Sequence, residues 1–317
     1  MRRRRSRDRR PRWALLPLLA ILMVLATLAG TRVAFALFTN TQTVTGNAFS
    51  TATLAPPTGV TATGGASITL NWTATTSTYA TGYNVLRGTA SGGPYTQIAQ
   101  VTPRTTTTYP DTPAVGTYYY VLQSYVQNWL SVNSNQATAG VSTNTGLLNC
   151  AANAAVTTNS GDNNGFELNP GNACAGDTLY AEDVNSGTGT GTGCTATTKD
   201  RHIFYNYGVS VPASVINGIE LRLDGFADSV TGSPRFCAEL SWNGGTSWTT
   251  AKVMAVNLTT TEATYTLGAA NDTWGRTWTP AELSDANFRV RITDRASDIT
   301  RDFRLEWAPV RVTYTPP

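Results

Sequence analysis

The stretch Ser67-Ile68-Thr69-Leu70-Asn71-Trp72 alternates polar with apolar side chains. Successive side chains of a β-strand point to opposite faces, so Ile68, Leu70 and Trp72 share one face and predict a half-buried strand. Further short strands separated by turn residues follow along the chain. The clearest of them are Tyr83–Arg87, Tyr95–Ile98 and Tyr118–Tyr125. This spacing predicts a β-sandwich over residues 56–141.

Three motifs within residues 56–141 resemble those of the fibronectin type III domain. They are the I-x-L-x-W of Ile68–Trp72, the Y-x-V-x-R of Tyr83–Arg87 and the Y-x-Y-x-L of Tyr118–Leu122. The resemblance implies that Trp72 packs between two sheets and that Tyr118 is the residue of the tyrosine corner. Domains of this family in exported bacterial proteins commonly act as spacers beside other modules.

Residues 142–317 form a larger predicted unit. Within it, Ile219, Leu221 and Leu223 point one way while the charged residues between them point the other, as in a strand with one buried face. The strand-like segments are Ile203–Tyr207, Ile216–Leu223, Phe236–Trp242, Ala263–Leu267, Phe288–Ile292 and Phe303–Tyr314. We expect a second β-sandwich of jelly-roll type, so the predicted fold class is all-β.

Two local resemblances occur in this second unit. The segment Ser241–Trp248 resembles the Asp-box hairpin of sialidase propellers, with Asn243 in place of Asp. A propeller needs repeated blades, so one copy predicts a tight turn and not a sialidase activity. In addition, three segments resemble a recurrent β-sandwich module of exported bacterial proteins, and this module has no settled activity. The segments are Ile216–Glu220, Leu240–Gly245 and Asp272–Arg276.

The charge of the chain is distributed unevenly. Of 317 residues with a formal net charge of +3, residues 1–32 hold nine Arg and one Asp. The remainder therefore has 14 basic and 19 acidic side chains, a net charge of −5. A mildly acidic body offers no basic stripe for phosphates, which argues against nucleic-acid binding. The 28 Gly and 14% charged residues are typical of an extracellular β-protein.

Residues 1–36 have the pattern of an export signal: an arginine-rich head, an apolar run from Trp13 to Gly30 and the small-x-small triplet Ala34-Phe35-Ala36. Two interpretations stay open. A signal peptidase removes the segment after Ala36, or residues 13–36 remain in the membrane as a single transmembrane helix, because the apolar run nearly reaches the roughly 20 residues that span a bilayer. Both place the rest outside the cell, at its surface or in the medium.

Residues 37–55 are predicted to be a Thr-rich strand or linker. The strings Gly30-Thr31, Phe38-Thr39-Asn40 and Asn47-Ala48-Phe49 resemble the leader region of the TasA and camelysin group of exported bacterial proteins. That resemblance covers about residues 20–54 and implies a dedicated signal peptidase. The segment either adds to a sheet edge of another copy, giving self-association, or serves as an extended spacer.

The four cysteines all lie in the second unit. Their even number suits two disulfides in an oxidising compartment. Four cysteines allow three connectivities, and we favour Cys150–Cys174 with Cys194–Cys237. The first pair would tie an entry loop to itself, and the second would tie a glycine-rich loop to a core strand.

No residue is assigned a catalytic role. His202 is the single histidine, and we expect it to be structural or on the surface. The sequence has no nucleophile elbow and no phosphate-binding loop. Calcium is the one cofactor that the sequence suggests, because Asp162, Asn164, Asp177 and Asp183 fall in a loop-rich segment and calcium prefers oxygen ligands.

The sequence predicts a non-enzymatic, exported bacterial protein with a structural or adhesive role, in which a fibronectin type III spacer presents a terminal β-sandwich. Such a protein would pack laterally through its sheet edges. The alternative is a carbohydrate-binding module, in which Trp274 and Trp278, beside Arg276, stack on the sugar rings of a polysaccharide.

Overall fold

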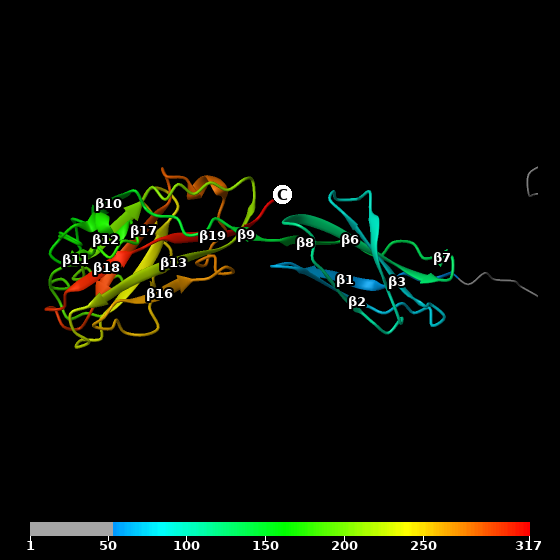
Figure 1. Ribbon diagram of the computed structural model, residues 1–317, viewed down its shortest axis with the longest axis horizontal. Coiled ribbons are helices and arrows are strands. Elements are labelled where there is room, and N and C mark those ends of the chain that lie inside the picture. The colour runs from blue at the N-terminus through cyan, green and yellow to red at the C-terminus, as the bar shows by residue number, and fades with distance from the viewer. Residues whose placement is uncertain (1–52) are drawn as a thin grey trace, which may run out of the picture. The chain divides into compact units, whose positions relative to one another are not determined.

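The computed structural model describes residues 53–317 (Figure 1). Its regular structure there consists of β-strands and short 3₁₀ helices, so the all-β prediction is confirmed. Within this range, no helix is long and apolar enough to cross a membrane. The predicted signal or anchor segment 1–36, its cleavage after Ala36 and most of segment 37–55 lie outside the described residues.

The first sandwich consists of two antiparallel sheets. One sheet has the order β1-β2-β5, and the other has the order β4-β3-β6, with β7 and β8 both paired to β6. The strands are β1 (Thr58–Thr63), β2 (Ile68–Thr73), β3 (Gly82–Gly88), β4 (Thr96–Val101), β5 (Thr108–Asp111), β6 (Gly116–Val126), β7 (Trp129–Leu130) and β8 (Ala137–Val141).

The core of this sandwich follows from the alternation in β2. Burial alternates residue by residue along this strand, and both Ile68 and Leu70 are fully buried. Trp72 is 6% exposed, and its ring lies edge-on against Tyr83 with the ring centroids 5.4 Å apart. The predicted core position of Trp72 is therefore confirmed.

Of Tyr118 and Tyr120 in β6, Tyr120 is the one that is buried. The Tyr120 hydroxyl donates to Asp111 Oδ2 at 2.7 Å, and Arg87 Nη1 donates to the same oxygen at 3.0 Å. Burial, together with the Asp111 carboxylate, raises the pKa of Tyr120 above its usual range. Tyr118 is half-buried, and the Arg87 guanidinium lies 5.1 Å from its ring centroid. The resemblance assigned the hydrogen-bonded tyrosine of the corner to Tyr118. In the structure, the hydrogen-bonded hydroxyl is that of Tyr120, so the assignment to Tyr118 is wrong.

We expect Tyr120→Phe to lower the free energy of unfolding of the first sandwich by about 1.5–3 kcal/mol, because a buried hydrogen bond to a charged group is lost. Chemical denaturation of the purified protein would measure this. Tyr118→Phe is the matched control, and its expected effect is below about 0.5 kcal/mol because the ring remains under Arg87. A larger loss in the Tyr118 variant than in the Tyr120 variant would contradict this assignment.

The second sandwich has two larger antiparallel sheets. One has the order β10-β12-β17-β14-β15, and the other has the order β11-β18-β13-β19-β9, with β16 also paired to β13. The strands are β9 (Thr143–Asn144), β10 (Ala152–Ala155), β11 (Ala181–Asp183), β12 (Arg201–Tyr205), β13 (Val215–Ala227), β14 (Arg235–Ser241), β15 (Lys252–Val253), β16 (Ala263–Gly268), β17 (Arg289–Arg295), β18 (Phe303–Trp307) and β19 (Val310–Thr315).

One apolar core lies between these two sheets. Phe236 of β14 and Phe303 of β18 come from different sheets, and their ring centroids are 5.5 Å apart. Ile219, Leu221 and Leu223 of β13 are fully buried, as their alternation predicts. The second β-sandwich is confirmed, whereas its jelly-roll type stays a prediction.

The predicted strand Phe303–Tyr314 is two strands in the structure. β18 ends at Trp307 and β19 begins at Val310, with Ala308 and Pro309 between them. Proline has no backbone N–H to donate to a neighbouring strand, so the hydrogen-bond ladder is interrupted there. Both β18 and β19 pair with β13, which is the longest strand of the second sandwich.

Two disulfides fix the loops of the second sandwich. Cys150 is bonded to Cys174, which follows the short 3₁₀ helix η2 (Pro170–Ala173). Cys194 is bonded to Cys237 in β14. These are the two pairs that the sequence analysis favours, and the second one attaches the glycine-rich loop to the core.

Candidate functional site

The hairpin Ser241–Trp248 forms one wall of a surface pocket. Ser241 Oγ accepts a hydrogen bond from the backbone N–H of Gly245 at 2.9 Å, and Asn243 Oδ1 accepts one from that of Ser247 at 2.8 Å. Gly244 and Gly245 have φ angles of +72° and +98°, which glycine adopts at little cost. The tight turn predicted for this segment is confirmed.

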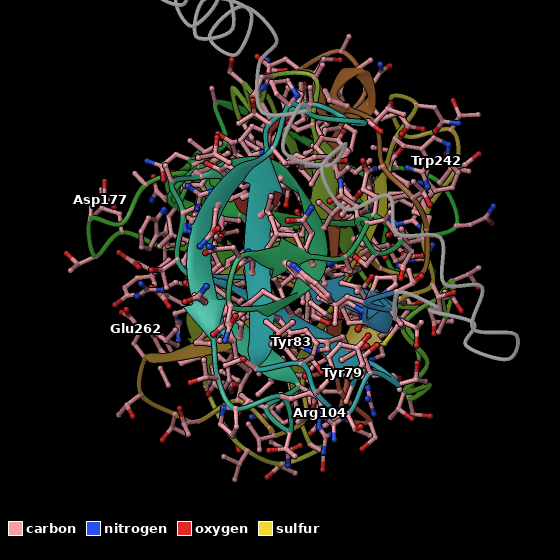
Figure 2. The ribbon with its side chains drawn as sticks, turned by 90° about the vertical axis from the view of Figure 1, so that its right-hand side faces the viewer. Tyr79, Tyr83, Arg104, Asp177, Trp242 and Glu262 are labelled. Atoms are coloured by element: carbon pink, nitrogen blue, oxygen red, sulfur yellow. A yellow bond between two sulfur atoms is a disulfide. The ribbon has the colours of Figure 1, made fainter. Side chains whose placement is uncertain are left out.

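The pocket has a volume of about 440 Å³ and is lined mainly by aromatic and basic side chains. Its lining residues are Trp242, Trp248, Thr249, Thr250, Ala251, Lys252, Trp274, Gly275 and Arg276. Trp242 and Trp248 are both partly exposed. Figure 2 shows Trp242 toward the periphery of the view.

Basic side chains orient the tryptophan rings. The Arg276 guanidinium lies between two rings, 4.1 Å from the Trp242 centroid and 4.4 Å from the Trp278 centroid. Arg276 also pairs with Glu282 at 2.7 Å. A cation over an indole face is attracted by the ring quadrupole, so Arg276 holds Trp242 in one orientation.

The other two tryptophans that line the pocket, Trp274 and Trp248, also lie against basic side chains. Lys252 Nζ lies 5.2 Å from the Trp274 ring centroid and 2.8 Å from Asp272 Oδ2. The Arg291 guanidinium lies 4.1 Å from the Trp248 centroid. The two lining cations, Lys252 and Arg276, each have a carboxylate partner, so these pairs add no net charge to the pocket.

Trp274 and Trp278, for which the sequence predicted sugar stacking, are only 4% and 3% exposed. Trp274 Nε1 donates to the carbonyl of Ile219, and Trp278 Nε1 donates to that of Thr273, both at 2.8 Å. Trp274 contributes to the pocket wall, while Trp278 packs in the core beneath Arg276. The accessible rings belong to Trp242 and Trp248, whose W-x-G-G-x-S-W pattern pointed only to a turn.

The four residues predicted to bind calcium are not gathered at one point. Asp177 Oδ1 accepts from the backbone N–H of Leu179 at 3.1 Å, and Figure 2 shows Asp177 at the opposite edge of the view from Trp242. Asp162 accepts from Asn164 Nδ2 at 2.9 Å. Asp183 instead lies with two aspartates that the sequence analysis did not select.

These three residues, Asp183, Asp200 and Asp294, form an acidic cluster buried in the second sandwich. They are 1%, 2% and 0% exposed. Burial, followed by the charge of Asp294, raises the pKa of Asp200 to about 8. Burial also raises the pKa values of Asp183 and Asp294 above the ordinary aspartate range.

His202 is a buried structural residue. Its Nδ1 accepts from the backbone N–H of Phe166 at 3.2 Å, so its Nε2 carries the proton and donates to Asn153 Oδ1 at 2.9 Å. Burial lowers the pKa of His202 to about 4. Because both ring nitrogens are engaged, His202 is not placed to act as a general base.

Comparisons with family models and with curated proteins found no match. Among solved structures, a fibronectin type III-like protein from Clostridium thermocellum is 38% identical over 28% of this chain and 95% of its own, with a TM-score of 0.25. A structure on the promiscuous specificity of carbohydrate-binding modules of the β-sandwich superfamily is 13% identical over 77% of this chain and 91% of its own, with a TM-score of 0.29. SGBP-B, from a complex xyloglucan utilization locus of Bacteroides uniformis, is 10% identical over 83% of this chain and 74% of its own, with a TM-score of 0.28.

Because these TM-scores are low, the fold assignment rests on the strand pairing of the chain itself. In the first sandwich, β1, β2 and β5 form one sheet, while β4, β3, β6 and β8 form the other, to which β7 adds only two residues. This division of seven strands is that of a fibronectin type III sandwich, an architecture related to the immunoglobulin fold. The chain thus contains a fibronectin type III-like β-sandwich followed by a second, larger antiparallel β-sandwich.

Proposed function

We propose that this chain is an exported, non-enzymatic binding protein whose second sandwich binds a saccharide in the pocket of Trp242, Trp248 and Arg276. The observation that carries the proposal is the pair of partly exposed indole rings beside hydrogen-bonding groups in one hollow. A pyranose ring has an apolar face that packs on an indole and hydroxyls that exchange hydrogen bonds with polar side chains. The first sandwich acts as a spacer.

The charges of the pocket favour a neutral saccharide. Lys252 is paired with Asp272, and Arg276 is paired with Glu282. An acidic sugar would have to compete with these carboxylates, whereas a neutral sugar can accept hydrogen bonds from the partly exposed Lys252 ammonium group. Neutral polysaccharides should therefore bind more tightly than uronic-acid polymers.

The test is affinity electrophoresis and isothermal titration calorimetry with xyloglucan, soluble cellulose derivatives, pectin and alginate. We expect Trp242→Ala to weaken binding of the neutral polymers by at least about tenfold, because a central aromatic contact is lost. Trp129→Ala is the matched control, since Trp129 is 59% exposed but belongs to the first sandwich. The Trp129→Ala variant should bind each neutral polymer with the same affinity as the unchanged protein.

Two outcomes would contradict the proposal. One is full binding by Trp242→Ala together with an unchanged melting temperature. The other is failure of the unchanged protein to bind any polymer of the panel. Sedimentation velocity on the same samples would then test the structural alternative, since a protein that packs through its sheet edges forms larger species as its concentration rises.

A further inference from the structure

We infer that Asp183, Asp200 and Asp294 bind a divalent cation, with Ca²⁺ as the preferred ion. One carboxylate oxygen from each residue lies within 4.8 Å of the other two. Oxygens that bind one Ca²⁺ at about 2.4 Å can be at most about 4.8 Å apart, so the three can share an ion. This site is separate from the saccharide pocket and does not depend on the proposed function.

The backbone brings these residues together from both sheets. Asp200 precedes β12 and Asp294 lies in β17, which is paired with β12, and the Asp294 N–H donates to the Asp200 carbonyl at 3.3 Å. Asp183 ends β11, which belongs to the other sheet. The cluster therefore joins the two sheets, and an ion there would cross-link them.

Most oxygens of the three carboxylates have no hydrogen-bond partner; the exception is Asp200 Oδ1, which accepts from the Asp162 N–H. Both oxygens of Asp183, both of Asp294 and Oδ2 of Asp200 are buried without a hydrogen bond. Within residues 53–317, none of the ion pairs closer than 4.0 Å involves any of the three. Burying an unpaired carboxylate is very costly, and a bound cation removes that cost.

A second cluster of three acidic residues in the same sandwich has hydrogen-bond and ion-pair partners, and it serves as a comparison. Asp224, Glu262 and Glu306 also approach within 4.8 Å of one another. There, Asp224 pairs with Arg222 at 2.6 Å, Glu262 accepts from the Tyr180 hydroxyl at 2.8 Å, and Glu306 accepts from the Thr178 N–H at 2.8 Å. Protein groups satisfy the second cluster, whereas the first has a cation nearby but most of its oxygens are without a hydrogen-bond partner.

That cation is Lys199, which is fully buried and donates to the Ser186 carbonyl at 2.8 Å. Three ionised aspartates and one lysine carry a net charge of −2. Glu167 makes it −3, so a divalent ion would lower the negative charge of the cluster to −1; Glu167 Oε1 accepts from Val184 N–H at 3.0 Å, and its Oε2 is buried without a partner. Asp162 contacts Asp200 Oδ1 through its backbone N–H at 3.1 Å.

The ligand chemistry favours calcium over softer metals. All unpartnered atoms of the cluster are carboxylate oxygens, while His202 has both nitrogens engaged and the four cysteines are in disulfides. Calcium accepts irregular sets of carboxylates and carbonyls, whereas magnesium needs a near-ideal octahedron. Gly161 allows the covering loop to approach closely, because a Cβ there would lie 2.0 Å from Asp200 Oδ1.

The test compares the purified protein in 5 mM CaCl₂ and in EGTA by calorimetry, and counts bound calcium by equilibrium dialysis with ⁴⁵Ca²⁺. We expect one ion per chain, and a rise in Tm of the second sandwich of about 5–10 °C when calcium is roughly 100 times its Kd. In Asp294→Asn, the ion and the Tm shift should both be lost. The Tm of this variant in EGTA should equal or exceed that of the unchanged protein, because a buried charge has been removed.

Glu262→Gln is the control, since it alters the satisfied cluster and should keep the full calcium response. Equal Tm values in CaCl₂ and EGTA, with no bound ⁴⁵Ca²⁺, would overturn the site and indicate that the aspartates hold protons instead. The same Tm shift with MgCl₂ at equal concentration would overturn the preference for calcium. A calcium response that survives in Asp294→Asn would also overturn the assignment.

Discussion

Removal of the Cys194–Cys237 disulfide, by replacing both cysteines with alanine, is expected to lower the free energy of unfolding of the second sandwich by about 4 kcal/mol. The bond closes a loop with a sequence separation of 43. The entropy of the unfolded chain that is lost on closing such a loop corresponds to about 4 kcal/mol at 25 °C. Alanine suits position 237, which is fully buried in β14.

The Cys150–Cys174 pair provides the comparison. Its sequence separation is 24, for which the same relation gives about 3.5 kcal/mol. Guanidinium denaturation followed by tryptophan fluorescence would report on the second sandwich, which contains five of the tryptophans. A loss below about 1 kcal/mol on removing Cys194–Cys237 would show that the loop stays in place without the bond.

Phe236→Ala is expected to cost about 3–5 kcal/mol of the stability of the second sandwich. Phe236 is fully buried, and its ring centroid lies 5.5 Å from that of Phe303 and 6.3 Å from that of Phe166. Truncation would remove the aromatic contacts that join the two sheets and would leave a cavity between them. The same denaturation experiment measures the loss.

Val256→Ala serves as the control for this experiment, because Val256 is 58% exposed. Its expected effect is below about 0.5 kcal/mol. If Phe236→Ala cost no more than the control, the neighbouring rings would have to collapse into the vacated space. The sheets would then be more adaptable than the close packing of protein interiors implies.

The strands that alternate clearly were predictable, and those that depend on tertiary contacts were not. β2 and β13 have apolar residues at every second position, as at Ile219, Leu221 and Leu223, and this alternation predicts a strand. β10 consists of small residues, Ala152–Ala155, and β11 has three residues. Such short segments become strands only because β12 and β18 supply their hydrogen-bond partners.

The candidate sites were harder to predict, because they depend on which residues the fold brings together. The sequence marks Trp274 and Trp278 as neighbours of Arg276 but cannot show that Ile219 and Thr273 accept hydrogen bonds from their indole N–H groups and keep them buried. Of the acidic cluster, only Asp183 was selected. Asp200 and Asp294 join it through the pairing of β12 with β17, which no local pattern reveals.

The arrangement of the disulfides also determines what a protease could do to this protein. One bond closes residues 150–174 and the other closes residues 194–237, so neither spans the segment between Cys174 and Cys194. A single cut in that segment would leave two fragments with no covalent link. β10 would then stay in place through strand pairing and core packing alone. If the cut falls after Asp183, that residue lies on one fragment and Asp200 and Asp294 lie on the other, so the proposed ion would connect the two fragments.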